Sequence, residues 1–357
     1  MPISFWNGKR VLVTGHTGFK GAWLSLWLEQ LGAEVTGYAL EPPTQPSLFA
    51  DAAVARGMHS ILGDVRDIEH LTAAVTECRP EVVFHLAAQS LVRVSYRDPV
   101  ETYATNVMGT VHVLEAVRRA GGVRVAVNVT SDKCYANARE SVAEFREEDP
   151  MGGGDPYSSS KGCAELVTSA YRTSFFSEPS CGVALASARA GNVIGGGDWA
   201  EDRLVPDCVR AMSEGRAVRI RNPEAVRPWQ FVLEPLSGYL LLAERLWSLG
   251  AACAEGWNFG PDEDDARPVR YVADRVVELW GQGASWEADA GEHPREAAWL
   301  RLDCTKARAR LSWRPALGLD EALRWTIQWY KGLAAGRDAR EMALDQIREY
   351  SRIRAAM

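Results

Sequence analysis

Apolar and polar positions along the first two-thirds of the chain repeat one pattern. Short β-branched runs end in small or polar residues, and each is followed by a segment whose apolar positions have helical spacing. The runs that predict strands are residues 10–14, 34–38, 81–86, 123–129 and 183–188, with a shorter run at 60–62. The segments that predict helices are residues 18–31, 68–78, 105–120 and 159–176. The longer strands are apolar on both faces, which favours a buried parallel sheet.

The pattern of predicted elements changes after about residue 190. Three consecutive glycines, at 195–197, and prolines at 206, 223, 228 and 235 separate shorter elements. Further helices are predicted at 204–213, 235–247 and 269–280, with a charged terminal helix at 334–356. We therefore predict an α/β fold with a doubly wound parallel sheet of the Rossmann type and a smaller C-terminal α/β lobe.

Composition and charge narrow the classes of function. The 357 residues are 46% hydrophobic, and the net charge of −7 includes no basic stripe that would favour a nucleic-acid partner. Seven cysteines are scattered singly, which indicates reduced thiols and a cytoplasmic location. No apolar run approaches the roughly 20 residues of a membrane span, and the first ten residues lack the order of a signal peptide. The six histidines show no metal-ligand spacing, so no metal site is predicted.

A glycine-rich turn follows the first predicted strand. It consists of Gly15, His16, Thr17, Gly18, Phe19, Lys20 and Gly21 and leads into an apolar helix. Glycines at these positions allow a tight turn, close approach of the backbone to a pyrophosphate, and close packing of helix on strand. We predict that this turn binds a dinucleotide and that residues 1–190 form the NAD-binding domain with the catalytic residues. Residues 191–357 are then mainly the substrate-binding lobe, with some chain returning to the Rossmann sheet.

The end of the second strand indicates which dinucleotide is bound. It carries no acidic residue for the ribose hydroxyls, since Glu41 lies just beyond it, and no arginine for a 2′-phosphate. NAD is therefore favoured over NADP. Asp64 and Val65, after the third strand, are placed to meet the adenine, and Asp67 can also cap the following helix.

Tyr157 and Lys161 are four residues apart, on one face of a predicted helix. An ammonium near a phenol lowers the pKa of the phenol, so the pair can act as a base beside a hydride acceptor. A strand ending in Ser131, Asp132 and Lys133 precedes them, and these polar residues either belong to the same site or form a solvated end of the strand.

These motifs together resemble the extended short-chain dehydrogenase/reductase family. The resemblance lies in the glycine turn, Asp64, the Leu86-Ala87-Ala88-Gln89 segment, the hydroxyl after the fifth strand, and the Tyr157 and Lys161 pair. Within the sugar-nucleotide dehydratase and epimerase group, the segments at 15–21, 131–135, 189–199 and 227–230 look like those of CDP-glucose 4,6-dehydratases. The relatives that act on dTDP-glucose have Asp-Glu where this chain has Asp132 and Lys133.

The resemblance implies a mechanism. Tyr157 takes the proton from the sugar O4 during oxidation at C4, with Ser131 aligning it, and Lys161 holds the nicotinamide ribose. Asp132 delivers a proton to the departing C6 hydroxyl. Lys133 stands where relatives use Glu to remove the C5 proton, and a lysine acts as a base only when its pKa is lowered.

The resemblance also implies binding residues and an assembly. Leu86, Ala87, Ala88, Gln89 and Asn106 belong to the cofactor site, and Gln89 also meets the sugar. Substrate-binding candidates are Asn192, Gly197 and Arg227, followed by Arg189, Arg219, Trp229, His293 and Arg295. A homodimer through a four-helix bundle, or a tetramer built from it, is implied, although the apolar faces of these helices can equally serve the core.

Two other interpretations remain at this point. One is a 4-epimerase or a dehydratase for another sugar nucleotide, and the other is a sensor that binds NAD without turnover. A sensor has no chemical need for the full set of Ser131, Asp132, Tyr157 and Lys161. The expected pathway is deoxysugar biosynthesis, such as that of lipopolysaccharide O-antigen.

Overall fold

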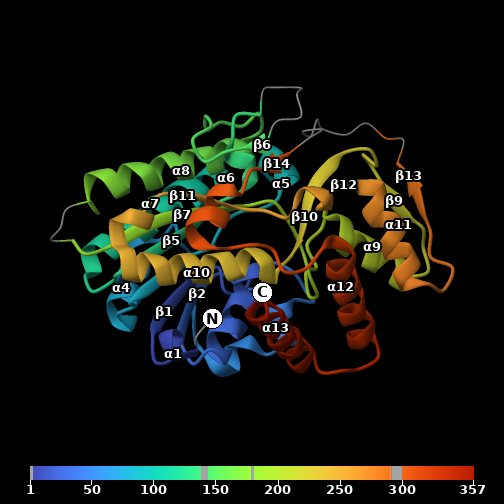
Figure 1. The fold of residues 1–357 in the computed structure, drawn as a ribbon, viewed down its shortest axis with the longest axis horizontal. Helices are drawn as coiled ribbons and strands as arrows, with labels where there is room; N and C mark the ends of the chain where they lie inside the picture. Colours follow the sequence, from blue (N-terminus) through green and yellow to red (C-terminus); the bar gives the residue numbers. More distant parts are fainter. Residues whose placement is uncertain (1–2, 138–143, 178–180, 290, 292–299) are drawn as a thin grey trace.

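A seven-stranded parallel sheet forms the centre of the molecule (Figure 1). The computed structural model describes residues 3–137, 144–177, 181–289, 291 and 300–357. In spatial order the strands are β11 (Gly256–Phe259), β7 (Ala184–Ala190), β5 (Val125–Val129), β4 (Val82–His85), β1 (Arg10–Thr14), β2 (Glu34–Ala39) and β3 (His59–Leu62). Every neighbouring pair is parallel. The predicted doubly wound sheet is therefore confirmed, with strand ends that differ from the prediction by one or two residues.

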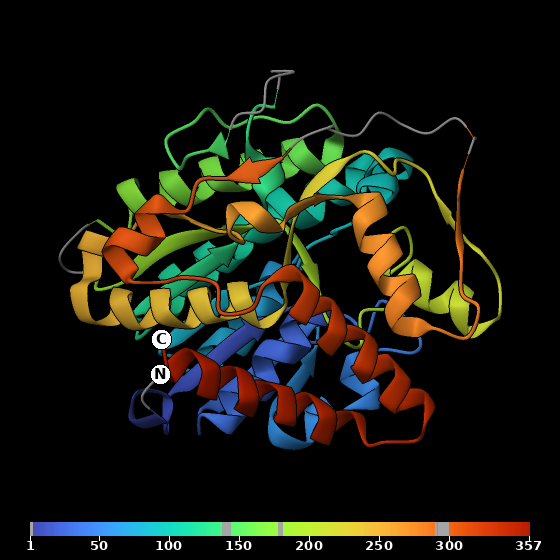
Figure 2. The same ribbon diagram turned by 45° about the vertical axis from the view of Figure 1, so that its right-hand side comes forward.

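Helices cover both faces of this sheet (Figures 1 and 2). One face carries α2 (Phe19–Gln30), α10 (Leu233–Leu249) and α13 (Ala339–Ala355), and the other carries α4 (Ile68–Cys78), α7 (Gly109–Ala120) and α8 (Pro156–Ser174). Strand β1 shows why both are needed, because Val11 and Val13 pack into one hydrophobic cluster and Leu12 into the other. Alternate side chains of a buried strand point to opposite faces.

A second lobe lies beside the sheet, at the right in Figure 1. Strand β10 (Val226–Phe231) pairs in parallel with β8 (Asn192–Ile194) and antiparallel with β12 (Ala266–Pro268). A separate pair consists of β9 (Val218–Ile220) and β13 (Trp286–Ala288). Helices α9 (Leu204–Ser213), α11 (Val269–Trp280) and α12 (Leu319–Ala334) complete the lobe. Trp325 and Trp329 on α12 are 6% and 1% exposed and pack in the core.

The remaining elements are short. They are α1 (Ile3–Trp6), α3 (Leu48–Asp51), α5 (Val92–Arg97), α6 (Pro99–Tyr103), β6 (Glu144–Phe145), β14 (Arg301–Leu302), four 3₁₀ turns (Val54–Gly57, Asp132–Cys134, Gly250–Cys253 and Glu263–Asp265) and two π segments (Ala104–Met108 and Ala307–Leu311). Strand β11 and helix α10 lie in the C-terminal half of the sequence, yet they extend and cover the large sheet. Among the described residues no helix is long and apolar enough to cross a membrane.

Two predicted helices differ most from the observed ones. The segment expected at 105–120 begins earlier, at Pro99, because Asp98 accepts a hydrogen bond from the Glu101 amide and caps the first turn. The terminal helix expected at 334–356 begins later, at Ala339. Its first expected residue, Ala334, is instead the last residue of α12. Gly336 has a φ of 79°, which breaks the helix between them.

The strand order reverses between β1 and β4. From β1 the chain continues to β2 and β3 on one side, and from β4 to β5 and β7 on the other. The loops that leave the carboxyl ends of β1, β4 and β5 therefore meet at one crevice, and open α/β sheets bind ligands at this point. These loops carry the glycine turn, Leu86 to Gln89, and Ser131 to Lys133.

Candidate active site

A cavity of about 730 Å³ opens at this crevice. Both lobes line it, with the glycine turn and the loops after β4 and β5 on one side and residues of α9, β9 and β10 on the other. Its volume is within the range of pockets that enclose a small-molecule ligand.

The glycine turn forms the wall of the cavity next to β1. Gly15 has a φ of 77°, and a Cβ on it would lie 2.7 Å from the Ala87 nitrogen. A Cβ on Gly21 would lie 2.1 Å from the Gly15 carbonyl oxygen, so only glycine allows helix α2 to start this close to the turn. Gly18 is the N-cap of α2, and no side chain caps the helix there. The uncapped amides at the start of α2 are suited to bind phosphate.

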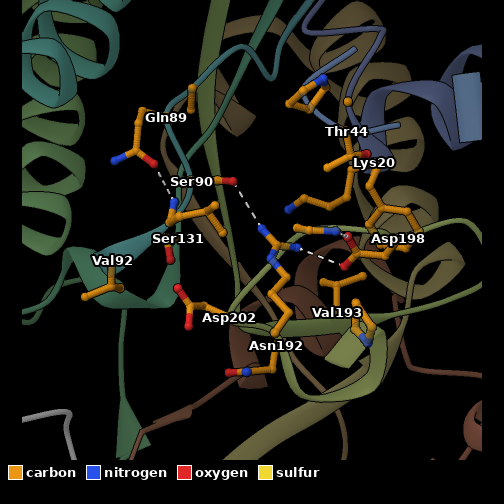
Figure 3. A pocket seen from close by; sticks show the side chains of 18 of the residues that line it. Lys20, Thr44, Gln89, Ser90, Val92, Ser131, Asn192, Val193, Asp198 and Asp202 are labelled. Atoms are coloured by element: carbon orange, nitrogen blue, oxygen red, sulfur yellow. Dashed lines mark hydrogen bonds and ion pairs between the residues drawn. The ribbon is translucent and has the colours of Figure 1, made fainter. Parts of the chain in front are cut away.

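Lys20 extends from this turn into the cavity (Figure 3). Within the described part of the chain its amine has no hydrogen bond or ion pair, and it lies 5.8 Å from the centroid of the Tyr239 ring. Burial, followed by the charges of Lys161 and Arg203, lowers the pKa of Lys20 to about 7. A diphosphate in the cavity would supply the counter-charge that this lysine lacks.

His16 was predicted to contact the cofactor, but its side chain does not line the cavity. The imidazole is buried, shares a hydrogen bond of 2.7 Å with the Ser60 hydroxyl, and packs edge-on against Phe49. It occupies the space beside Gly37, where a Cβ would lie 2.3 Å from the ring. Burial lowers the pKa of His16 to about 4, so the ring is neutral.

Asp64 and Val65 line the cavity beyond the end of β3, together with Leu40 and Glu41 after β2. The Asp64 carboxylate accepts hydrogen bonds from the Arg66 guanidinium and amide, and these hold its pKa below the usual value. Asp67 caps α4 by accepting a hydrogen bond from the His70 amide, as predicted.

The loop after β4 also lines the cavity, through Leu86, Ala87, Ala88 and Gln89. Asn106 was predicted to bind the cofactor, but it lies behind this loop and outside the lining. Its side chain bonds to the backbone N–H and C=O of Gln89 at 2.9 and 3.0 Å and to the Ser160 hydroxyl at 2.8 Å. Asn106 therefore joins the loop to helix α8 rather than facing a ligand.

Ser131, Asp132, Lys133, Tyr157 and Lys161 all line this cavity. Ser131 caps the 3₁₀ turn after β5, accepting from the Lys133 amide at 3.2 Å and donating to Asp132 Oδ1 at 3.0 Å. Helix α8 begins at Pro156, capped by Asp155, so that Tyr157 and Lys161 project from its first two turns. The structure thus brings together the five residues that the sequence proposed as catalytic.

Burial dominates the electrostatics of these groups. It raises the pKa of Asp132, which Lys133, Ser131 and Arg227 partly oppose, so this carboxyl is suited to hold a proton. Burial lowers the pKa of Lys161 to about 8, and Glu165 opposes that change.

The phenol of Tyr157 differs from the prediction. Burial raises the pKa of Tyr157 to about 12, and the main influence that lowers it is a hydrogen bond with Ser131 rather than the Lys161 ammonium. Desolvation of the phenolate therefore outweighs the neighbouring cation. Lys133 Nζ lies 5.9 Å from the centroid of the Tyr157 ring.

Arg189 was a substrate-binding candidate, but the structure places it in the core. Its guanidinium donates to Glu165 at 2.8 Å and to the Tyr135 hydroxyl at 2.7 Å, and the residue is 5% exposed. Glu165 in turn accepts from the hydroxyls of Thr130 and Ser187 at 2.5 and 2.7 Å. This cluster lies beneath the catalytic turn and holds it to α8, so Arg189 cannot reach a ligand in the cavity.

The other substrate-binding candidates have different positions. Asn192, Gly197, Arg227 and Trp229 line the cavity, and Arg227 is close enough to Asp132 to lower the pKa of that carboxyl. Arg219 lies at the margin, largely exposed, and pairs with Glu287 at 3.1 Å. His293 and Arg295 lie outside the described residues.

The sequence interpretation missed Arg203. This residue precedes α9 and donates to the Ser90 hydroxyl at 3.1 Å and to the Asp198 carboxylate at 3.2 Å, across the cavity between the two lobes (Figure 3 shows both acceptors). Nearby, Asp202 pairs with Arg93 of α5 at 3.4 Å. The charged run Asp198 to Arg203 directly after the glycine-rich segment was the signal that could have identified it.

Comparison with known proteins agrees with this site. A family model described as GDP-mannose 4,6-dehydratase matches residues 12–257, which is more than half of the chain. The chain belongs to this family of sugar-nucleotide dehydratases. The match includes the glycine turn, the catalytic turn and the Tyr157 and Lys161 pair.

Individual members of the dehydratase family and its neighbours are similar to the whole chain. It is 56% identical to the CDP-glucose 4,6-dehydratase of Salmonella typhimurium over 97% of both chains. The solved UDP-glucose 4-epimerase of Thermus thermophilus, in complex with NAD, has a TM-score of 0.78 and 28% identity over 90% of this chain and 99% of that one. The dTDP-glucose 4,6-dehydratase of Bacillus anthracis has a TM-score of 0.75 at 22% identity, covering 91% and 97%.

The residues present in this dehydratase fit a dinucleotide. The glycines at 15 and 21 leave no room for side chains, α2 begins without a side-chain cap, and the Lys20 amine faces the same space. Beyond the turn, Asp64 and Val65 line the cavity after the end of β3, and Tyr157 and Lys161 line it from helix α8.

Proposed function

We propose that this protein is an NAD-dependent enzyme that converts CDP-D-glucose to CDP-4-dehydro-6-deoxy-D-glucose. The observation that carries the proposal is the meeting of Ser131, Asp132, Lys133, Tyr157 and Lys161 in one cavity with a dinucleotide-binding turn. The 56% identity to the CDP-glucose 4,6-dehydratase of Salmonella typhimurium supports CDP-glucose as the substrate. The net reaction is loss of water with no net change in oxidation state.

The residues that would hold NAD are those of the glycine turn with Lys20, and Asp64, Val65 and Lys161. When bound, NAD supplies the hydride acceptor for C4 and the hydride donor for C6, and its cationic ring favours the phenolate of Tyr157.

The protein's own residues handle the protons. Tyr157 takes the proton from the sugar O4, against the pKa of about 12 that burial imposes on it. Once C4 is a ketone, the C5 proton is acidic, and Lys133 removes it. Asp132, whose pKa burial raises, gives its proton to the C6 hydroxyl, and that group leaves as water. Lys133 then returns its proton to C5.

The second lobe holds the nucleotide. Arg227 and Arg203 are two of the arginines that line the cavity from this side, and guanidinium groups suit diphosphate oxygens. Asn192 and Gly197 line the same region. Arg203 must exchange its bond to Ser90 or Asp198 for one to the ligand.

Product chemistry tests the proposal. The purified protein is incubated with CDP-, dTDP-, UDP- and GDP-glucose, and products are identified by mass and by NMR. Conversion of CDP-glucose to a product lighter by one water, whose 4-keto group absorbs in the near ultraviolet in base, is expected. A hexose epimerised at C4 that keeps its O6 would instead make the protein a 4-epimerase. Binding of NAD without any product would indicate the sensor.

We further infer a homodimer through α7 and α8. Large apolar side chains are exposed near these helices, with Leu166 at 60%, Met108 at 47% and Phe175 at 44%. Such side chains on two adjacent helices favour burial against a second copy. Sedimentation analysis is expected to give a dimer, and the Leu166→Asp variant a monomer. A monomeric parent protein would contradict this inference.

We place the enzyme in the cytoplasm, in deoxysugar biosynthesis of the kind that serves lipopolysaccharide O-antigen. All seven cysteines are free thiols, in keeping with a reducing compartment. Fractionation of cells that produce the protein tests the location.

A further inference from the structure

An enzyme that acts on CDP-glucose must distinguish cytosine from uracil and thymine. Cytosine carries an amino group at C4, which donates hydrogen bonds, whereas uracil and thymine carry an oxygen there, which accepts them. A site that selects cytosine therefore needs a hydrogen-bond acceptor opposite C4 and apolar walls for the two faces of the ring.

Three carboxylates among the described residues line the cavity from the second lobe, namely Asp198, Asp202 and Asp207. Asp198 is 3% exposed, and both of its oxygens accept hydrogen bonds from its own loop, at 3.2 Å each. Asp202 Oδ1 is shared by two guanidinium groups, those of Arg221 at 2.7 Å and Arg93 at 3.4 Å. These two carboxylates hold the segment between the lobes, which leaves Asp207 as the acceptor for a base.

Asp207 is held in place by one oxygen and keeps the other for a ligand. Its Oδ1 accepts from the Arg210 guanidinium, which also donates to the Trp199 carbonyl at 2.7 Å. Within the ranges that the structure describes, Oδ2 has no hydrogen bond, and the side chain, 35% exposed, lines the cavity. Burial raises the pKa of this carboxyl, and the charge of Arg210 is the main influence that opposes the change. A carboxylate fixed through one oxygen is preorganised to accept with the second.

Asp207 lies one helical turn from Arg203, a guanidinium proposed to meet the diphosphate. The Asp207 amide donates to the Arg203 carbonyl at 2.9 Å, so the two residues are in the i, i+4 relation and share one face of α9. A turn rises about 5.4 Å, which is of the order of the distance that a ribose puts between a phosphate and its base. Leu204 of the same turn and Val218 and Ile220 of the adjoining β9 also line the cavity. These three side chains supply apolar walls for a flat ring.

We propose that Asp207 selects the base of the substrate, with Oδ2 accepting a hydrogen bond from the 4-amino group of cytosine while the diphosphate is held at Arg203. The same carboxylate excludes uracil and thymine, because two acceptors would then face each other with no proton between them. Acidic side chains accept from the cytosine amino group in the same way in nucleic-acid recognition. The inference rests on the proposed function for the sugar nucleotide and adds the residue that determines its base.

Calorimetry with CDP and UDP, in the presence of NAD, measures this selection without the reaction. Wild type should bind CDP at least about 10-fold more tightly than UDP. Asp207→Asn should lower this ratio of affinities by roughly 10- to 100-fold, since one base contact contributes discrimination of that order and the new amide can donate to the C4 oxygen of uracil. Asp202→Asn is the matched control, because it removes the same charge from the same cavity, and it should leave the ratio unchanged.

A ligand analogue tests the same contact without any substitution, so the test holds even if circular dichroism shows that Asp207→Asn does not fold. A nucleoside diphosphate whose pyrimidin-2-one base lacks the 4-amino group should bind wild type about 10-fold or more weakly than CDP. Equal binding of this analogue and CDP overturns the proposal, and so does an Asp207→Asn variant that keeps the wild-type ratio. A ratio that falls equally in Asp202→Asn overturns it too, because charge alone would then account for the effect.

Failure of the proposed function has a different signature. If wild type prefers CDP to UDP but converts no CDP-glucose, the proposed dehydration is wrong and the selection of cytosine by Asp207 stands. If wild type dehydrates CDP-glucose and UDP-glucose with equal kcat/KM, the dehydration stands and the selection is refuted.

Discussion

Replacement of Arg189 by methionine separates the role that the sequence indicated from the role that the structure gives it. The side chains of Arg189 and Glu165 are 5% and 4% exposed and are joined at 2.8 Å. Burial alone would raise the pKa of Glu165, but Arg189 and two hydroxyl donors hold it below the usual value. Methionine keeps most of the side-chain volume and removes the charge.

The magnitude follows from what remains after the substitution. Removing one partner of a buried pair leaves an unpaired buried charge and costs about 3–5 kcal/mol. Urea denaturation at pH 8 measures this loss in the free energy of unfolding. The double variant Glu165→Gln with Arg189→Met should recover part of it. The control is Arg219→Met, since the side chains of Arg219 and Glu287 are 75% and 57% exposed. An exposed pair contributes about 0–1 kcal/mol.

Kinetics supply the result that would refute this reasoning. If Arg189 has a structural role, the folded fraction of Arg189→Met should have an almost unchanged KM for CDP-glucose and a lower kcat. The reason is that the cluster holds the turn that carries Ser131 and Asp132. If Arg189→Met keeps the full free energy of unfolding and instead raises KM, Arg189 binds the substrate as the sequence indicated.

Four further predictions follow. Tyr157→Phe should bind NAD as wild type does but lose at least about 10²-fold in dehydration rate, measured by product NMR, because no phenol is left to take the O4 proton. Lys133→Met should accumulate the 4-keto sugar that still has its C6 hydroxyl together with reduced cofactor, which is followed by its near-ultraviolet absorbance. Fast elimination in this variant would assign removal of the C5 proton to another group. Burial raises the pKa of Glu234 to about 7. A carboxyl whose pKa is raised in the folded state stabilises the fold at low pH, and this contribution is lost as the pH rises through that pKa. The free energy of unfolding of wild type should therefore fall by about 3 kcal/mol relative to that of Glu234→Gln between about pH 4.5 and 7. Urea denaturation at several pH values measures this difference. Gly21→Ala places a Cβ 2.1 Å from the Gly15 carbonyl oxygen and should abolish NAD binding in calorimetry, whereas native affinity would contradict the close approach.

Local patterns predicted most of the fold. The β-branched runs were sufficient for the strands of the large sheet up to β7, because a strand buried on both faces must be apolar throughout. Strand β11 was not predicted, since its four residues, Gly256–Phe259, gain their partner only from the distant β7. The π segment Ala104–Met108 was also missed, because i→i+5 hydrogen bonds in place of i→i+4 leave no separate mark in the apolar pattern of the helix expected at 105–120.

The site was predictable where chemistry and spacing coincide, as in the five residues around Tyr157. It was not predictable where the direction of a side chain decides whether a residue faces the cavity. His16 and Arg189 lie within motifs that line the cavity, yet one faces Gly37 and the other faces Glu165. A motif fixes the path of the backbone, but neighbouring residues on each strand point to opposite faces. Arg203 acquires its place through Ser90, 113 positions away in the sequence.

The buried cluster beneath the turn also bears on how a neutral carboxyl, Asp132, and a charged ammonium, Lys161, coexist in the lining of one cavity. Asp132 must stay neutral and Lys161 charged, although burial acts on both. Glu165 favours the charged form of Lys161. Without Arg189, burial would raise the pKa of Glu165, and this carboxylate would itself tend to take up a proton. Arg189 neutralises most of that carboxylate, so it can orient Thr130 and α8 while adding little net charge near Asp132. The pair therefore acts as a neutral anchor. A hydrophobic pair of equal volume would leave the Thr130 and Ser187 hydroxyls without their acceptor.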